Sequence, residues 1–259
     1  MEQTLKLMRI LPLILMFIIA SLKAQNPQLI AHRGFWKTEN SAQNSISSLK
    51  NAQQLGVYGS EFDVRMTKDG VLIINHDEDI NGIFISENLY RDIEHLTLRN
   101  GEYIPTFLQY LQQGKKAPKV KMIVELKPEK SAEREIEMAK KAVKIIREQN
   151  METQCEFISF SLNICKVLKK EMPDAVVLYL NGDLSPAELK AEELNGLDYH
   201  HKILTERYPN WLKEASVLGL ITNAWTVNDQ KIYQQLKSQG IQFITTDIPH
   251  QLKNLYNEK

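Results

Sequence analysis

Two short segments of this 259-residue sequence carry charged side chains at a spacing that places them on one face of a strand. Glu61 and Asp63 are separated by one residue, and so are Glu125 and Lys127. Residues two apart in a strand point to the same side, and neighbouring carboxylates resist ionisation unless a cation lies between them. Ligation by oxygen alone favours Ca²⁺ or Mg²⁺ over Zn²⁺. The pattern predicts a divalent-cation site made of Glu61, Asp63 and Glu125, or else two pairs of solvated charges at strand ends.

Two histidines are expected beside these charges, because His32 and His76 each follow a short apolar run. The dipeptide Asp69-Gly70 lies between two apolar runs, which indicates a hairpin. Counting outward from that turn places His76 opposite Asp63. Facing residues in a hairpin have Cβ atoms about 5 Å apart, so His76 is predicted to share a site with the carboxylates.

Such a site suits a phosphate ester. Arg33, Lys127 and a divalent cation together would bind an anion, and phosphate best of all. Two imidazoles can act as general base and general acid in phosphoryl transfer. The sequence contains no GxxxxGK[ST], GxGxxG or GxSxG motif. Nucleotide hydrolysis, Rossmann redox chemistry and the usual serine hydrolase mechanism are therefore disfavoured.

The elements that would position these residues alternate along the chain. Helical periodicity occurs in residues 45–55, 131–149 and 229–239, between short apolar runs typical of strands. These runs are Leu29–His32, Tyr58–Asp63, Val71–Asn75, Val120–Leu126, Phe157–Phe160, Ala175–Leu180, Leu197–Tyr199, Gly219–Trp225 and Phe243–Thr245. Strand–helix alternation indicates an α/β fold, either a barrel or a doubly wound sheet.

One of these nine runs is surplus to a (β/α)8 barrel. Val71–Asn75 is the second strand of the expected hairpin, which is antiparallel and therefore lies outside a parallel ring. Removing it leaves eight strands, the number in a TIM barrel. The polar, aperiodic segment Asp79–Glu102 breaks the alternation and is expected to be a loop insertion at the strand ends.

Composition supports a globular protein without nucleic acid as a partner. The chain is 43% hydrophobic and 25% charged, which excludes disordered, collagenous and coiled-coil classes. Lys+Arg and Asp+Glu both total 32, so no net positive charge attracts nucleic acid. The two cysteines, Cys155 and Cys165, are too few for a disulfide scaffold. They are expected either as one disulfide bond or as two buried thiols.

The beginning of the chain has the pattern of a secretory signal peptide. Lys6 and Arg9 precede the apolar run Ile10–Ala20, which is too short to span a bilayer comfortably. We expect residues 1–24 to be the signal peptide and residues 25–259 to be the mature domain. The mature protein would then be periplasmic or secreted, without a stable membrane span. The alternative is an uncleaved membrane anchor.

The order and spacing of several short motifs resemble those of the glycerophosphodiester phosphodiesterase family. The resemblance runs from about Ile30 to Pro249, nearly the whole expected mature chain. The motifs are Ala31–Gly34, Thr38–Ser41, Glu61–Val64, Thr67–Gly70, Asn75–Asp77, Glu125–Lys127, Asn223–Asn228 and Thr245–Asp247. The resemblance implies a TIM barrel of the phospholipase C-like phosphodiesterase type, with the extra hairpin and the insertion added to it.

The resemblance also implies an activity and the residues that perform it. The family hydrolyses glycerophosphodiesters, which are deacylated phospholipids, to glycerol 3-phosphate and an alcohol, and so serves lipid and glycerol metabolism. By position, His32 and His76 correspond to its acid/base pair. The metal ligands, for Ca²⁺ or Mg²⁺, correspond to Glu61, Asp63 and Glu125.

Three further positions correspond to residues that bind the substrate. Arg33 and Lys127 match the phosphate-binding cations of the family. Trp225 matches an aromatic residue that packs against the glycerol part, or else is a core tryptophan. One motif departs from the family, since Thr38 and Ser41 replace the first and last residues of its Pro-Glu-Asn-Thr segment. The missing proline removes a rigid turn element, which bears on substrate choice more than on chemistry.

Two other functions stay open at this stage. A related phosphodiesterase would act on glycerophosphoinositol or on a (lyso)phospholipid, and a panel of headgroups would discriminate between them. Residues 79–102 lack an exposed apolar helix for gripping lipid, which favours a soluble diester. A non-catalytic exported barrel would bind phosphodiesters without turning them over.

Overall fold

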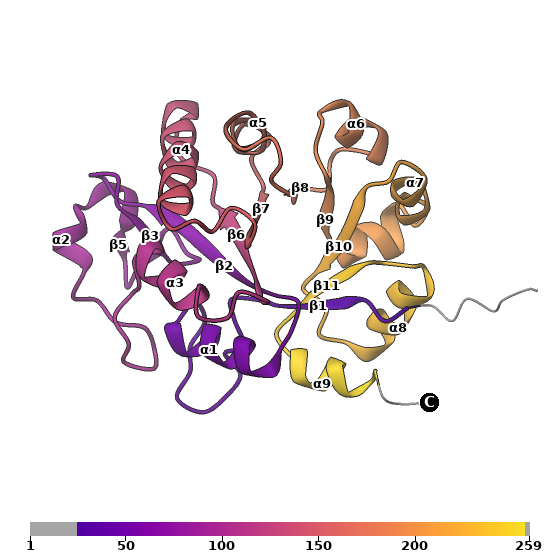
Figure 1. Ribbon diagram of the computed structural model, residues 1–259, viewed down its shortest axis with the longest axis horizontal. Coiled ribbons are helices and arrows are strands. Elements are labelled where there is room, and N and C mark those ends of the chain that lie inside the picture. Colours follow the sequence, from indigo (N-terminus) through magenta and orange to yellow (C-terminus); the bar gives the residue numbers. More distant parts are fainter. Residues whose placement is uncertain (1–24, 257–259) are drawn as a thin grey trace, which may run out of the picture.

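Eight parallel strands close into a barrel in the computed structural model, which describes residues 25–256 (Figure 1). The ring closes where β1 (Gln28–Ala31) pairs on one side with β11 (Phe243–Thr246) and on the other with β2 (Gly59–Met66). The remaining barrel strands, in chain order, are β6 (Lys121–Leu126), β7 (Cys155–Ser159), β8 (Val177–Tyr179), β9 (Gly196–His200) and β10 (Ile221–Trp225). The predicted (β/α)8 barrel is therefore confirmed, and closure excludes the doubly wound sheet.

The extra strand β3 (Leu72–Ile74) runs antiparallel to β2 outside the ring, as the sequence predicted. Its register, however, differs from the prediction by one residue. Val64 lies opposite Ile74, and the Asn75 N–H donates to the Asp63 carbonyl at 3.0 Å. Asp63 therefore faces Asn75 in the hairpin.

The turn explains this shift. The Thr67 N–H donates to the Val71 carbonyl at 3.0 Å, so three residues form the loop where the prediction assumed two. Gly70 takes the left-handed conformation with φ of 81° and forms the bulge that accompanies three-residue hairpin loops. An extra loop residue moves every pairing beyond it by one position.

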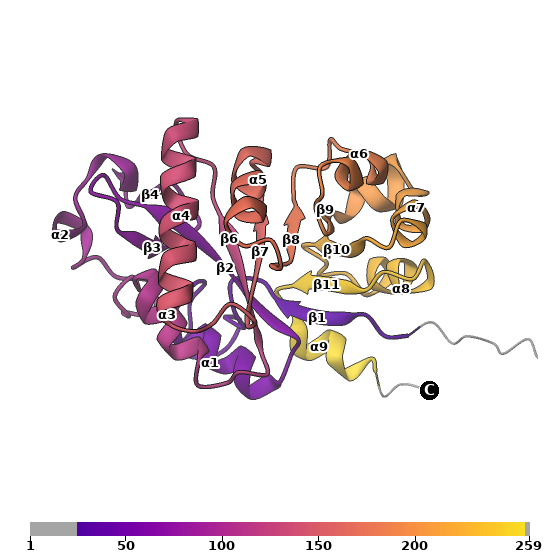
Figure 2. The same cartoon turned by 45° about the horizontal axis from the view of Figure 1, so that its top comes forward.

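Helices cover the outside of the barrel (Figures 1 and 2). The predicted helical segments appear as α1 (Ile46–Leu55), α4 (Ala132–Glu148) and α8 (Gln230–Ser238), each within two residues of the expected bounds. The others are α3 (Phe107–Gly114), α5 (Leu162–Glu171), α6 (Pro186–Ala191), α7 (Trp211–Val217) and α9 (Pro249–Asn254), with a π-helical turn at Ile203–Arg207. Side-chain caps fix several helix starts: the Ser131 hydroxyl accepts from the Arg134 N–H and begins α4.

Successive side chains along each strand point alternately out of the barrel and into it, which produces two separate apolar layers. Outward-facing residues such as Phe62 and Val124 pack against the helices in one large cluster. Inward-facing Ile30, Ile123 and Ile158 belong to a smaller cluster that fills the barrel interior. Inward-facing residues further along the strands are charged, so the polar site lies at the carboxyl ends of the strands, as in barrel enzymes generally.

The predicted insertion forms a small unit of its own beside the hairpin. It contains a two-stranded sheet of β4 (Asp79–Ile80) and β5 (Ile83–Phe84), a 3₁₀ turn at Ile85–Glu87 and α2 (Tyr90–Ile93). Buried isoleucines pack this unit against β3; they are Ile73, Ile80, Ile85, Ile93 and Ile104.

Three expectations concern the remainder of the chain. The predicted signal peptide, residues 1–24, lies outside the described residues. None of the helices between residues 25 and 256 combines the length and apolar character needed to cross a membrane. Cys155 and Cys165 are both free and buried, which agrees with the second of the two states expected for them.

Candidate active site

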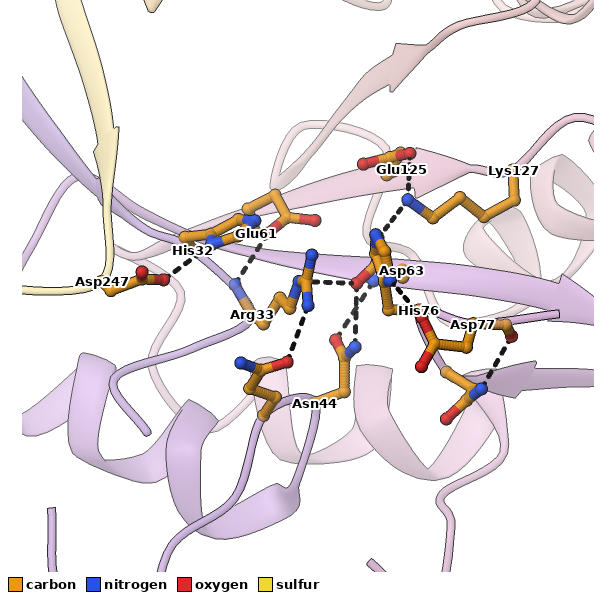
Figure 3. A network of polar contacts seen from close by, with 12 residues as sticks. His32, Arg33, Asn44, Glu61, Asp63, His76, Asp77, Glu125, Lys127 and Asp247 are labelled. Atoms are coloured by element: carbon orange, nitrogen blue, oxygen red, sulfur yellow. Dashed lines mark hydrogen bonds and ion pairs between the residues drawn. The ribbon is translucent and has the colours of Figure 1, made fainter. Parts of the chain in front are cut away.

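A cavity of about 150 Å³ opens among the carboxyl ends of the barrel strands. Seven of the eight predicted site residues line it: His32, Arg33, Glu61, His76, Glu125, Lys127 and Trp225. The eighth, Asp63, is 1% exposed and contacts both Arg33 and Lys127. The structure therefore brings together residues from β2, β6 and the loops after β1, β3 and β6 (Figure 3), with Trp225 added from β10.

The three predicted metal ligands form one cluster. Glu61, Asp63 and Glu125 are buried, and one carboxylate oxygen from each lies within 4.8 Å of those of the other two. Glu61 and Asp63 point inward from β2, while Glu125 points inward from β6 and lies opposite Asp63 in the parallel register. The two-residue spacing in each strand and the pairing of the strands are enough to produce this arrangement.

The Lys127 ammonium lies between two of these carboxylates. Its Nζ is 2.7 Å from Asp63 Oδ1 and 2.5 Å from Glu125 Oε1. Burial opposes ionisation of Asp63, but the charge of Lys127, assisted by His76 and Arg33, holds the pKa of that carboxyl well below its usual range. Lys127 and Asp63 thus form a charged pair inside the barrel.

The other two carboxylates are in a less favourable environment. Burial, together with the charges of Asp63 and Glu125, raises the pKa of Glu61 well above its usual range. Burial and the charge of Asp63 raise the pKa of Glu125 to about 7, although Lys127 opposes the shift. Like charges held this close stabilise the protonated forms until a cation joins them.

The donor set fits a hard divalent cation. Glu61 Oε2 accepts a hydrogen bond from the Arg33 N–H at 2.7 Å, but Glu61 Oε1 is buried with no hydrogen-bond partner among the described residues. A buried carboxylate oxygen without a donor is costly, and a cation would relieve that cost. Three carboxylates with no nitrogen or sulfur ligand suit Ca²⁺ or Mg²⁺.

The loop after β1 is strained so that it can reach the site. Arg33 takes a left-handed conformation with φ of 55°, which is uncommon for a residue with a side chain. The next residue, Gly34, has φ of 77°, and a Cβ there would lie 2.8 Å from the backbone carbon of Ser48. This tight turn directs the Arg33 N–H to Glu61 and brings Arg33 Nε within 3.5 Å of Asp63 Oδ2.

Two further residues of this loop reach the site, although no motif in the sequence pointed to them. Asn44 donates from Nδ2 to Asp63 Oδ2 at 2.8 Å and accepts from the Asp63 N–H at 3.2 Å. Gln43 Oε1 accepts from Arg33 Nη1 at 2.7 Å. The start of α1 is a signal that could have located them, because the Ser45 hydroxyl caps that helix and fixes the residues before it.

This finding corrects the placement of one family motif. Thr38–Ser41 was matched to the family's Pro-Glu-Asn-Thr segment, but its central residues Glu39 and Asn40 are exposed. The Asn-Ser pair that reaches the carboxylates and caps α1 is Asn44-Ser45. The conclusion drawn from the missing proline at Thr38 therefore falls away.

The His32 side chain is held by Asp247, which follows the last barrel strand. Its Nδ1 lies 2.7 Å from Asp247 Oδ1, and Asn228 Nδ2 donates to Asp247 Oδ2 at 2.7 Å. Burial opposes ionisation of Asp247, but hydrogen bonds from His32 and Asn228 lower the pKa of that carboxyl to about 2. An ionised carboxylate on Nδ1 leaves Nε2 as the ring nitrogen available for chemistry.

His76 is held differently, on the hairpin side of the cavity. Its Nδ1 lies 2.7 Å from Asp77 Oδ1, and its carbonyl accepts from Arg65 Nε at 3.0 Å and Nη2 at 2.8 Å. Burial lowers the pKa of the His76 imidazole, and the charge of Lys127 adds to that effect against the opposing charge of Asp63. His76 is near Asp63 even though the hairpin register differs from the predicted one.

The wall of the cavity away from these charges is apolar. Trp225 packs edge-on against Phe160, with ring centroids 5.6 Å apart, and against His200 at 5.1 Å. Its indole Nε1 donates to the carbonyl of Asp198 at 2.9 Å, which fixes the ring at the cavity wall. Phe160 also lines the cavity.

The comparisons with known proteins agree with this arrangement. Residues 32–251 match the model of the glycerophosphoryl diester phosphodiesterase family. A glycerophosphodiester phosphodiesterase from Caldanaerobacter subterraneus is 28% identical over 243 residues, which are 88% of this chain and 96% of the relative.

Solved structures show the same fold. The crystal structure of a glycerophosphodiester phosphodiesterase from Parabacteroides distasonis is 43% identical, with a TM-score of 0.88 over 90% of this chain and 98% of that one. An Oleispira antarctica phosphodiesterase in complex with the product sn-glycerol-3-phosphate is 23% identical, with a TM-score of 0.75 over 88% of this chain and 96% of that one. The family match covers most of the sequence, and the chain therefore belongs to the glycerophosphoryl diester phosphodiesterase family of metal-dependent hydrolases.

Proposed function

We propose that this protein hydrolyses glycerophosphodiesters to glycerol 3-phosphate and an alcohol, with His32 and His76 as the acid/base pair. The observation that carries the proposal is that two histidines, two cations and two carboxylates of the Glu61, Asp63 and Glu125 cluster line one cavity. In a phosphodiester the attacking group must lose a proton and the departing alcohol must gain one. One imidazole for each transfer meets that need.

The surroundings of the two histidines assign a role to each. His76 has a lowered pKa, so at neutral pH its ring is unprotonated and can accept a proton from the attacking hydroxyl, of water or of the substrate's own glycerol. With His76 as the base, His32 is the other imidazole at the cavity, and the hydrogen bond from its Nδ1 to the ionised Asp247 leaves Nε2 as the nitrogen that exchanges a proton. His32 is therefore assigned the transfer to the leaving alcohol.

The cationic side chains bind and orient the phosphate. Arg33 and Lys127 line the cavity, and each also pairs with Asp63, which holds its head group in place. Prepositioned charges stabilise the negative charge that grows on the phosphate oxygens during the reaction. Glu61, Asp63 and Glu125 would hold Ca²⁺ or Mg²⁺, which supplies further neutralisation of that charge when bound.

Trp225 and Phe160 form the part of the site that would contact carbon atoms. Both rings line the cavity and pack against each other. We assign Trp225 to packing against the glycerol moiety. Replacing it with leucine is expected to raise KM for a glycerophosphodiester more than it lowers kcat, and an unchanged KM would return Trp225 to a core role.

The proposed location of the protein depends on the sequence alone. Lys6, Arg9 and the apolar run Ile10–Ala20 support export with cleavage after Ala24, to the periplasm or out of the cell. Mass spectrometry of the N-terminal peptide of the expressed protein tests this. A mature start at Gln25 supports export, and a retained Met1 in a membrane fraction supports the uncleaved anchor.

A further inference from the structure

Asp198 is a buried acid at the cavity for which the proposed reaction has no use. It points inward from β9, is 1% exposed, and lines the same cavity as His32 and Glu61. Neither of its carboxylate oxygens has a hydrogen-bond partner among the described residues. Buried polar groups are nearly always hydrogen-bonded, so two unpaired oxygens at the wall of a binding cavity indicate a ligand that donates hydrogen bonds.

The neighbouring strand adds a third acceptor. Asn223 lies opposite Asp198 in the parallel register of β9 and β10, so both side chains face the barrel interior. Its Nδ2 donates to Thr245 Oγ1 at 2.9 Å, while its Oδ1 is buried without a partner. The two residues therefore present three buried acceptor oxygens together, and none of the three has a donor within hydrogen-bond distance among the described residues.

The position of this pair relative to the charges limits which part of a substrate it meets. In the closed ring, four strand steps separate β9 from β2, which carries Glu61 and Asp63, so Asp198 lies across the barrel from them. Trp225, beside Asp198, belongs to the apolar wall. A phosphate held by Arg33 and Lys127 would extend the organic part of its ester across the cavity toward Asp198.

We propose that Asp198, assisted by Asn223, binds the free hydroxyl groups of the substrate's glycerol moiety and so selects deacylated phosphodiesters. This inference rests on the proposed function. A free glycerol end carries two hydroxyls, which can donate to the unpaired oxygens of the pair. An acyl chain on either hydroxyl removes a donor and adds bulk in a cavity of about 150 Å³. A site built to bind a hydroxyl rejects analogues that lack it, because its buried polar groups are then left unpaired.

The protonation of Asp198 agrees with a neutral partner. Burial, with the nearby charge of Glu125, raises the pKa of the Asp198 carboxyl well above its usual range, although the neighbouring Asn223 side chain opposes the shift. A protonated carboxyl can both donate to and accept from a hydroxyl. It does so without placing another negative charge beside the phosphate.

The test compares two substrates that differ only in these hydroxyls. Glycerophosphocholine carries both, and propylphosphocholine carries neither. Asp198→Ala is expected to lower kcat/KM for glycerophosphocholine about 10–100-fold, the range for loss of hydrogen bonds to a buried group. If water is the attacking group, the same variant should change kcat/KM for propylphosphocholine by less than about 2-fold, since that substrate never uses Asp198. If the glycerol hydroxyl attacks, propylphosphocholine is not hydrolysed at all and the binding comparison below decides. An equal loss on both substrates would overturn the inference and place Asp198 in support of the metal site or the fold.

Two further variants keep the result interpretable. Asp198→Asn retains the shape of the side chain and serves if the alanine variant fails to fold. Asp174→Asn is the matched control, because Asp174 is exposed in the turn before β8, at the other end of the barrel. It should leave both substrates unchanged.

A binding measurement separates this inference from the proposed function. Calorimetry compares sn-glycerol 3-phosphate with propyl phosphate, on wild type and on Asp198→Ala, and needs no turnover. We expect wild type to bind the glycerol compound at least 10-fold more tightly and the variant to bind the two alike. If propylphosphocholine or both diesters are not hydrolysed, this comparison alone decides, and equal affinity of wild type for the two ligands would overturn the inference.

Discussion

His32 Nδ1 and Asp247 Oδ1 lie 2.7 Å apart, although 215 residues separate them in the sequence. His32 follows the first barrel strand and Asp247 follows the last, so the pair forms only because β1 and β11 lie side by side. The strand pairing that closes the barrel therefore also brings His32 and Asp247 together.

Asp247→Asn is expected to keep the fold and lower kcat about 10²-fold or more. The amide can donate to the His32 ring as well as accept from it, so it can hold the ring in the wrong tautomer. Steady-state kinetics on glycerophosphocholine, with melting curves and Asp174→Asn as a control, measure the effect. A rate within about 2-fold of wild type would show that His32 needs no carboxylate partner.

His32→Ala and His76→Ala are each expected to lower kcat about 10²–10⁴-fold, the usual contribution of a general acid or base. Both side chains are partly exposed at the cavity, so their removal should leave the melting temperature nearly unchanged. His95→Ala, an exposed histidine of the insertion, is the matched control. A near-normal rate for either variant would remove that histidine from the mechanism.

Glu61→Gln is expected to abolish stabilisation by divalent ions. Wild type should melt at a higher temperature with Ca²⁺ or Mg²⁺ than with EDTA, since a ligand at 100 times its Kd adds about 2.7 kcal/mol. The variant retains shape but loses one of the three carboxylates. Glu152→Gln, in an exposed turn before β7, should respond like wild type. Equal melting shifts in Glu61→Gln and wild type would place the ion elsewhere.

Glu125→Gln should become more stable relative to the wild type as pH rises, when both are kept in EDTA. The pKa of Glu125 is raised from 4.5 to about 7 in the folded protein, so the folded state holds more protons than the unfolded state in that interval. Unfolding free energy from this group therefore falls as pH increases through the interval. The lowered pKa of His76 acts in the opposite direction, but it contributes to both proteins.

Melting curves at pH 5 and pH 7.5 measure this difference. We expect the variant to exceed wild type by about 2–6 °C at the higher pH and to match it at the lower one. If the melting temperature of the variant instead falls relative to that of wild type as pH rises, the Glu125 carboxylate is stabilised by Lys127 more than it is repelled by its neighbours.

Much of the fold could be predicted because the residue pattern of each strand depends only on positions close together in the sequence. The alternation that places Glu61 with Asp63, and Glu125 with Lys127, needs only the two-residue period of a strand. The start of α4 could be predicted for the same reason, because Ser131 caps it by accepting from the N–H of Arg134, three residues away. Closure of the ring was one of two outcomes compatible with the same pattern, and only the pairing of β1 with both β2 and β11 decides between them.

The parts of the site that sequence reasoning missed depend on backbone conformation or on distant contacts. The left-handed turn at Arg33 and Gly34 determines that Asn44, not Asn40, meets Asp63. One additional loop residue before Gly70 shifts the hairpin register. The unpaired state of Asp198 is visible only once its neighbours are known.

The most direct test of the account is release of glycerol 3-phosphate from glycerophosphocholine by the purified protein, first in EDTA and then with Ca²⁺ or Mg²⁺ restored. The account predicts turnover that EDTA abolishes and the metal restores in wild type, and that neither ion restores in Glu61→Gln. Turnover that persists undiminished in EDTA would contradict the carboxylate metal site. Binding of glycerophosphodiesters without turnover under any of these conditions would contradict the catalytic role and leave a binding protein.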